Sequence, residues 1–177
     1  MTVTFTAYGT PAPQGSKRHV GRGVMVESSK AVKPWREAVK AAALDAMAGA
    51  PPLDGALVAR MVFTVRKPAS APKRRRTWPD RTPDLSKLCR ATEDALTEAG
   101  VWADDARVVE YERLAKVFPG EDPEALHLPG VRITVARVAP TDPAAADPRS
   151  VGEVVGCNHV LGLGVESPPS LPLAVGG

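Results

Sequence analysis

Residues 83–111 read PDLSKLCRATEDALTEAGVWADDARVVEY, and this stretch decides the fold. Apolar residues recur from Asp84 to Ala99 at the spacing that gathers side chains on one face of a helix. That face comprises Leu85, Leu88, Ala95, Leu96 and Ala99. Asp84 can cap the start of the helix, and Gly100 fits its end. The stretch therefore predicts an amphipathic helix over residues 84–99 that packs on a core.

Segments of alternating or apolar character surround this helix. Five of them predict strands: residues 3–8, 24–26, 57–65, 107–118 and 130–138. The Ala-rich stretch from Pro34 to Met47 predicts a second helix. The segment from Gly9 to Gly23 is rich in proline, glycine and basic residues and indicates a loop. The resulting order is β-β-α-β-α-β-β.

This order predicts an α+β fold, with a mixed β-sheet and two main helices in a single domain over residues 1–138. From Pro140 onward the sequence holds six prolines, six glycines and no aromatic residue. A segment of that composition cannot bury enough apolar surface to fold. We therefore expect residues 139–177 to form a disordered, low-complexity tail.

The composition is typical of a soluble globular protein. Apolar residues make up 44% and charged residues 24% of the 177 residues. No stretch approaches the roughly 20 apolar residues of a membrane-spanning helix, and the N-terminus lacks the pattern of a secretory signal. The only two cysteines, Cys89 and Cys157, are too few for a disulfide framework. We expect an intracellular, cytoplasmic protein with both thiols free.

Basic residues concentrate before the tail. The last 38 residues carry one basic residue and four acids, so the rest holds 22 Lys and Arg against 16 Asp and Glu, a net charge of +6. The span from Arg60 to Arg76 contains no acid, which predicts a phosphate-binding surface, with a solubilising loop as the alternative. The predicted DNA contacts are Lys17, Arg18, Lys73, Arg74, Arg75, Arg76 and Lys87. Trp78 can stack on an exposed base or simply anchor the loop.

Three aspartates lie near the two ends of the helix. Asp84 stands at its entry, and Asp104 and Asp105 follow its end. A helix of about 16 residues is roughly 24 Å long, so both ends can line one pocket only if the chain doubles back, as the strand from Arg107 allows. Carboxylates beside a basic loop suit Mg²⁺ bound to phosphate. The alternative is that these residues only cap a helix and form a turn.

Residues 83–111 resemble the signature segment of the RusA family of Holliday junction resolvases. The family pattern runs Asp-Leu-Asp-Asn-Leu, a basic residue two positions later, then Asp-Ala-Leu, Gly, Trp and Asp-Asp before a strand. The order of the flanking elements extends the resemblance over residues 1–138. It implies a homodimeric, Mg²⁺-dependent endonuclease, for which Mn²⁺ can substitute, that makes paired symmetric nicks in four-way DNA junctions during recombination and repair. Such enzymes are often encoded by phages and prophages.

The resemblance also implies roles for particular residues. Asp84 and Asp105 match metal-ligating catalytic aspartates, and Asp104 is a weaker ligand candidate. Arg90 stands where the family usually has a lysine, and its role is expected to be electrostatic because an arginine pKa above about 12 excludes proton donation. Ser86 replaces the second family aspartate; its hydroxyl can coordinate Mg²⁺ but adds no charge, so we expect weaker metal binding.

Several alternatives stay open. Asp80 can fold in to replace the missing carboxylate, and Asp94 can pair with Arg90 at four residues' spacing. The loss of the carboxylate at Ser86 is also compatible with a junction-binding protein that no longer cuts. A nonspecific DNA-binding protein, without preference for branched DNA, is the third possibility.

Overall fold

A computed structural model of the chain describes residues 1–15, 17–19, 25–27, 30–72 and 74–139. Met1–Ala139 form one compact unit. The predicted tail lies outside the described residues from residue 140 on, and the domain boundary at residue 139 stays a prediction. None of the helices in the described ranges has the length and apolar character needed to cross a membrane.

The described strands and α-helices follow the predicted order with one additional strand. They are β1 (Thr2–Tyr8), β2 (Lys17–His19), β3 (Met25–Glu27), α1 (Val32–Met47), β4 (Leu57–Thr64), α2 (Leu85–Glu98), a short 3₁₀ helix (Asp105–Arg107), β5 (Val108–Val117) and β6 (Gly130–Arg137). The addition is β2, which pairs antiparallel with β3 inside the segment predicted to be a loop. Lys17–His19 contain no apolar alternation, so no pattern in the sequence indicated a strand there.

Four strands form a mixed sheet in the order β1-β6-β4-β5. The β1–β6 and β6–β4 pairs are antiparallel, whereas β4 and β5 are parallel. β4 is the most apolar strand and lies inside the sheet, where both of its faces are largely covered. The predicted α+β class and mixed sheet are confirmed.

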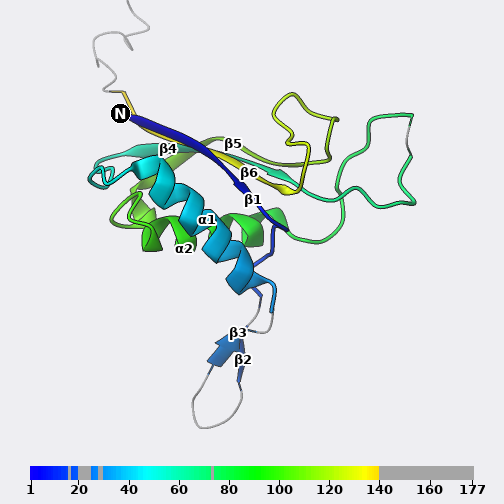
Figure 1. Cartoon of the computed structure of the whole chain (residues 1–177), viewed down its shortest axis with the longest axis horizontal. Helices are drawn as coiled ribbons and strands as arrows, with labels where there is room; N and C mark the ends of the chain where they lie inside the picture. The colour runs from blue at the N-terminus through cyan, green and yellow to red at the C-terminus, as the bar shows by residue number, and fades with distance from the viewer. Residues whose placement is uncertain (16, 20–24, 28–29, 73, 140–177) are drawn as a thin grey trace, which may run out of the picture. The chain divides into compact units, whose positions relative to one another are not determined.

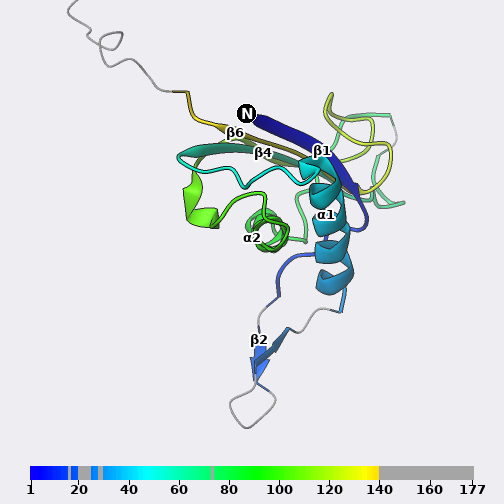
Figure 2. The same ribbon diagram turned by 60° about the vertical axis from the view of Figure 1, so that its left-hand side comes forward.

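Both helices lie on the same face of this sheet (Figures 1 and 2). Leu57, Met61 and Phe63 of β4 are fully buried against the apolar faces of α1 and α2. Trp35 of α1 donates a 3.3 Å hydrogen bond from its Nε1 to Oγ1 of the buried Thr92 of α2. Burial of a large apolar side chain contributes about 1.5–3 kcal/mol, so this core fixes the two helices against the sheet.

The direction of α2 relative to β5 positions the candidate site. Lys116, near the end of β5, donates hydrogen bonds of 2.6 and 2.7 Å from its Nζ to the carbonyl oxygens of Arg81 and Pro83, just before α2. At the other end, only a turn and the short 3₁₀ helix separate the end of α2 from the start of β5. The two elements therefore run in opposite directions, and the start of α2 lies at the end of β5.

Candidate active site and DNA-binding surface

Asp84 occupies the N-cap position of α2 but does not act as a cap. Its carboxylate makes no capping hydrogen bond, and its Oδ2 instead pairs with Lys87 Nζ at 2.7 Å. Both side chains are about half exposed. The hydrogen bond and the charge of Lys87 hold the pKa of Asp84 below its usual value, with a smaller contribution from Lys116. The carboxylate is therefore ionised and accessible to an external ligand.

Ser86 and Arg90 also lie on the exposed side of α2. Arg90 follows Asp84 by six residues, about 9 Å along the helix axis. The predicted pairing of Asp94 with Arg90 is wrong, because Asp94 Oδ2 accepts a 3.2 Å hydrogen bond from Arg36 of α1. Arg90 has no carboxylate partner among the described residues and can contact a phosphate.

Asp104 and Asp105 lie beyond the opposite end of α2, in the turn before β5. Asp104 Oδ1 accepts a 2.8 Å hydrogen bond from the backbone N–H of Ala106, so this carboxylate caps the 3₁₀ helix, as the turn interpretation predicts. The Asp105 side chain is exposed and has no hydrogen-bond partner in the described part of the chain. Close to this turn, Arg107 pairs with Asp54 at 3.2 Å.

The two principal aspartates are not brought together within one chain. α2 has 14 residues, which corresponds to about 21 Å, and separates Asp84 from Asp105. The strand after the turn does return along α2, as the sequence indicated. However, Asp105 precedes that strand and so remains at the far end, whereas Lys116 near the strand's end reaches the segment before Asp84.

One copy of the chain therefore does not supply the predicted metal ligands from a single pocket. Across the described ranges, no group of three or more His, Cys, Asp or Glu side chains could hold a metal ion. Asp80 does not join Asp84 in such a group, so the structure does not support it as the replacement carboxylate. Ser86 adds only a neutral hydroxyl. The metal-binding roles of Asp84, Asp104, Asp105 and Ser86 stay predictions.

The segment of residues 66–83, named here the basic loop, is fastened by Glu121. The carboxylate of Glu121 accepts hydrogen bonds from Lys67 Nζ and, at 3.1 Å, from the backbone N–H of Thr77. Lys67 lies near the start of the basic loop and Thr77 on its return. The hydrogen bond from Lys67 is the main cause that lowers the pKa of Glu121. One ionised carboxylate thus joins the two limbs of the loop.

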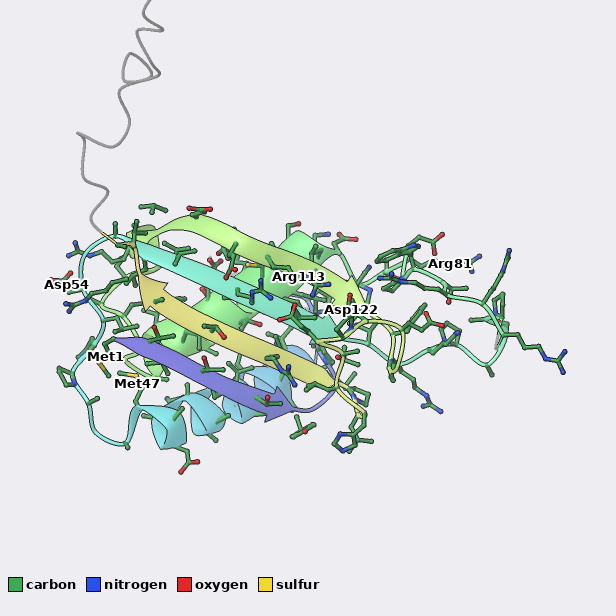
Figure 3. The ribbon with its side chains drawn as sticks, turned by 90° about the horizontal axis from the view of Figure 1, so that it is seen from above. Met1, Met47, Asp54, Arg81, Arg113 and Asp122 are labelled. Atoms are coloured by element: carbon green, nitrogen blue, oxygen red, sulfur yellow. The ribbon has the colours of Figure 1, made fainter. Side chains whose placement is uncertain are left out.

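Asp122 fastens the same loop at a second point. Its side chain is only 4% exposed, and its Oδ2 lies 2.5 Å from Arg113 Nη2 of β5 and 3.6 Å from Arg76 Nη2. Figure 3 shows Arg113 and Asp122 close together over the open face of the sheet. The hydrogen bond from Arg113 is the main cause that lowers the pKa of Asp122. Arg76, predicted as a DNA contact, is therefore also part of the loop's internal support.

The other predicted DNA contacts differ in what the structure describes. Arg74 and Arg75 are exposed, and neither has a carboxylate partner in the described part of the chain. Lys73 lies outside the described residues. Lys17 and Arg18 belong to β2, but the structure does not describe their side chains. Their role, like that of Lys87, stays a prediction.

Further segments meet the start of α2. Gln14 donates a 3.0 Å hydrogen bond from its backbone N–H to the carbonyl of Lys87, three residues before β2 begins. Lys116 fixes the basic loop immediately before Asp84. Asp84 is therefore positioned next to two basic segments of the chain. The opposite end of the unit carries Asp54, and Figure 3 shows Asp54 and Arg81 at opposite ends of the sheet.

Sequence reasoning missed Glu121, Asp122 and Lys116 as supports of this site. Glu121 and Thr77 are 44 positions apart, so no local spacing connects them. Two acids after a Pro-Gly turn usually face solvent, and a lysine within a strand has many uses. The only available signal was the charge contrast between the acid-free basic loop and these two acids.

No individual curated protein matches the chain. The sequence profile of a family described as Endodeoxyribonuclease RusA matches residues 8–135, which is most of the chain. The match runs from Tyr8, the last residue of β1, to Val135 in β6 and therefore includes Asp84, the basic loop and Asp105. The chain belongs to the RusA family of endodeoxyribonucleases.

Proposed function

We propose that two copies of this chain together cut four-way DNA junctions by paired, Mg²⁺-dependent nicking. Membership of the RusA family implies an endonuclease that acts on Holliday junctions and supports dependence on a divalent metal ion. The observation that carries the finer proposal is the separation of Asp84 from Asp105 by the length of α2. A single subunit lacks the carboxylate pair, whereas two subunits in opposite orientation can complete it.

The edge of the sheet supports such an arrangement. β5 is an outer strand, so its free edge pairs with no strand of the described chain. Val109 on this strand is 64% exposed. An open edge is a template for pairing with another chain, and a two-fold axis would pair two copies of β5 antiparallel. The start of each β5 then lies beside the end of the other.

This pairing would complete two sites. Asp105 precedes β5, and Lys116 near the end of β5 reaches the segment before Asp84. In the antiparallel pair, Asp105 therefore approaches Asp84 of the partner subunit, and the second site is related by symmetry. Charge favours the same contact, because the end with Asp54, Asp104 and Asp105 would meet the end with the basic loop.

Each residue then has a defined task. Asp84 and Asp105 of the partner subunit would be the carboxylate ligands of Mg²⁺ or Mn²⁺, with Ser86 as a neutral ligand and Asp104 mainly shaping the turn. A divalent ion bound to carboxylates and phosphate offsets charge and orients water. Arg90 would contact the phosphate. The exposed arginines of the basic loop would hold the DNA. Because the DNA substrate lies inside the cell, the protein would act there too.

A second function is favoured by the ion pair of Asp84. Lys87 occupies the carboxylate at 2.7 Å, and Ser86 adds no charge where the family has an aspartate. Both features weaken cation binding, so the chain could bind junctions without cutting them. Synthetic four-way junctions and linear duplex of the same sequence, incubated with Mg²⁺, Mn²⁺ or chelator, separate the two functions.

Paired nicks confined to the junction and lost in Asp105→Asn support cleavage. Junction binding without nicks under either metal supports the binding protein, and Ser86→Asp should then restore cutting. Equal affinity for junction and duplex would contradict both functions.

A further inference from the structure

The basic loop lines a partly open cavity next to Asp84. Its volume is about 630 Å³, within the range of small-molecule sites in proteins. Its lining includes Pro83, which precedes Asp84, together with Phe118, Thr10 and Pro11. The cavity therefore lies between the end of β5, the segment after β1 and the basic loop.

Trp78 forms an aromatic wall of this cavity. Its side chain is 61% exposed, whereas Trp35 and Trp102 are each 1% exposed. The guanidinium of Arg76 lies over the Trp78 ring, 4.1 Å from the ring centroid. Because Arg76, which also lines the cavity, is paired with Asp122, the orientation of the ring is linked to an ion pair that reaches Arg113 of β5. An exposed aromatic ring held in a fixed orientation is a preformed stacking surface.

Arginines that form no ion pair in the described part of the chain line the same cavity as Trp78. Arg66, Arg75 and Arg81 line the cavity, and none of them has a carboxylate partner among the described residues. This differs from Arg76 and Lys67, whose charges are satisfied by Asp122 and Glu121. The cavity thus offers a flat apolar surface together with several free guanidinium groups, which matches one base and the phosphates on either side of it.

We propose that this cavity takes one unpaired nucleotide of the DNA, with the base stacked on Trp78 and the flanking phosphates held by Arg75 and Arg81. The proposal rests on the proposed function, since it identifies the feature of branched DNA that the chain recognises beside the cut. Stacking on an aromatic side chain is tolerant of sequence, so the cavity would select an unpaired base rather than a particular base.

The test measures binding of the full chain to two duplexes in the presence of chelator, so that no cleavage occurs. One duplex is fully paired, and the other carries a single extra unpaired thymidine. Wild-type protein should bind the second duplex roughly tenfold more tightly. Its tryptophan fluorescence should be quenched only by that duplex, because Trp78 is the one exposed tryptophan of the three. Thymidine monophosphate alone serves as the probe for a free-nucleotide site.

The variants separate stacking from charge. Trp78→Ala should abolish the tenfold preference and the quenching, while Trp78→Phe should retain most of the preference. Arg74→Ala, on the same loop but outside the cavity lining, should weaken binding of both duplexes equally. A full preference in Trp78→Ala overturns the proposal, as does quenching by thymidine monophosphate as strong as by the DNA. If the wild-type protein binds neither duplex, that result would instead contradict the proposed function.

Discussion

The carboxylate of Asp84 is paired with the ammonium group of Lys87 at 2.7 Å, one helical turn further along α2. A cation that binds Asp84 must displace Lys87, so the lysine competes with the metal. We predict that Lys87→Asn, which introduces the residue usual in the family, raises the affinity for Mn²⁺. It should also raise the pKa of Asp84 toward its ordinary value, because Lys87 is the main cause of the lowered pKa. Carboxyl-carbon NMR titration measures the pKa, and calorimetry measures the metal affinity.

An unchanged Asp84 pKa in Lys87→Asn would show that the ion pair does not form in solution. Lys40→Asn on α1 removes the same charge from a different helix and is the control.

The acids that fasten the basic loop make stability depend on pH. The pKa values of Glu121 and Asp122 are lowered by hydrogen bonds from Lys67 and Arg113. A lowered folded pKa contributes stability above the ordinary values of 4.5 and 3.8, and this contribution is lost as the pH falls through the folded values. We predict a stability plateau above about pH 5 and a decline below about pH 4. Chemical unfolding at a series of pH values across this range measures the free energy of unfolding.

Glu121→Gln isolates one of these contributions. It should lower the free energy of unfolding at pH 7 and reduce its pH dependence, because a neutral amide accepts weaker hydrogen bonds from Lys67 and Thr77 than the carboxylate does. Trypsin should also cleave faster after Arg74 and Arg75, because the basic loop is held less firmly without the Glu121 carboxylate. The control Glu110→Gln removes the same charge from an exposed position of β5. Equal effects of the two substitutions would argue against a fastening role for Glu121.

The salt dependence of DNA binding should identify which arginines contact phosphate. Each phosphate contact contributes about 0.9 to the slope of log K against log salt concentration for B-form DNA. We predict that Arg75→Ala reduces the slope by about 0.9. Arg137→Ala, at the other end of the sheet beside the start of β4, should leave it unchanged. Binding measured at several salt concentrations provides both slopes, and an equal loss in the two variants would exclude a localised DNA surface.

Lys116 is expected to act as a positioning residue. Its Nζ holds the carbonyl oxygens of Arg81 and Pro83 at 2.6 and 2.7 Å, immediately before Asp84. We predict that Lys116→Met lowers the rate of junction cleavage about tenfold while junction affinity changes less than twofold, because a misplaced catalytic group costs rate more than binding. Single-turnover cleavage and equilibrium binding separate the two effects. A loss confined to affinity would instead identify Lys116 as a DNA contact.

Much of the fold could be predicted from local patterns in the sequence. The helix over residues 85–98 follows from the apolar spacing of Leu88, Ala95 and Leu96, all fully buried. Alternation likewise predicted β4, β5 and β6. β2 was missed because Lys17–His19 present only polar side chains, and pairing with β3 rather than propensity makes them a strand.

The site was harder to predict from the sequence, because it depends on contacts between residues that are distant in the chain and on the direction in which the chain runs after α2. The length of the helix showed that its two ends are far apart. It did not show that Asp105 would lie before the returning strand, at the end of α2 that is distant from Asp84. The cap interpretation was wrong for Asp84, whereas the turn interpretation holds for Asp104, whose carboxylate caps the 3₁₀ helix that follows it. The hydrogen bond from Thr77 to Glu121 spans 44 positions and leaves no sequence pattern.

The central claim is that each active site combines Asp84 of one subunit with Asp105 of the other, and mixing two inactive variants tests it most directly. Asp84→Asn and Asp105→Asn are each predicted to be inactive on a four-way junction with Mg²⁺ or Mn²⁺. When the two are unfolded, mixed and refolded together, the mixed dimers should regain one intact site and cut one strand, giving single nicks rather than paired ones. If the mixture stays as inactive as its components while wild-type protein recovers activity after the same treatment, both aspartates act within one subunit and the shared-site account is contradicted.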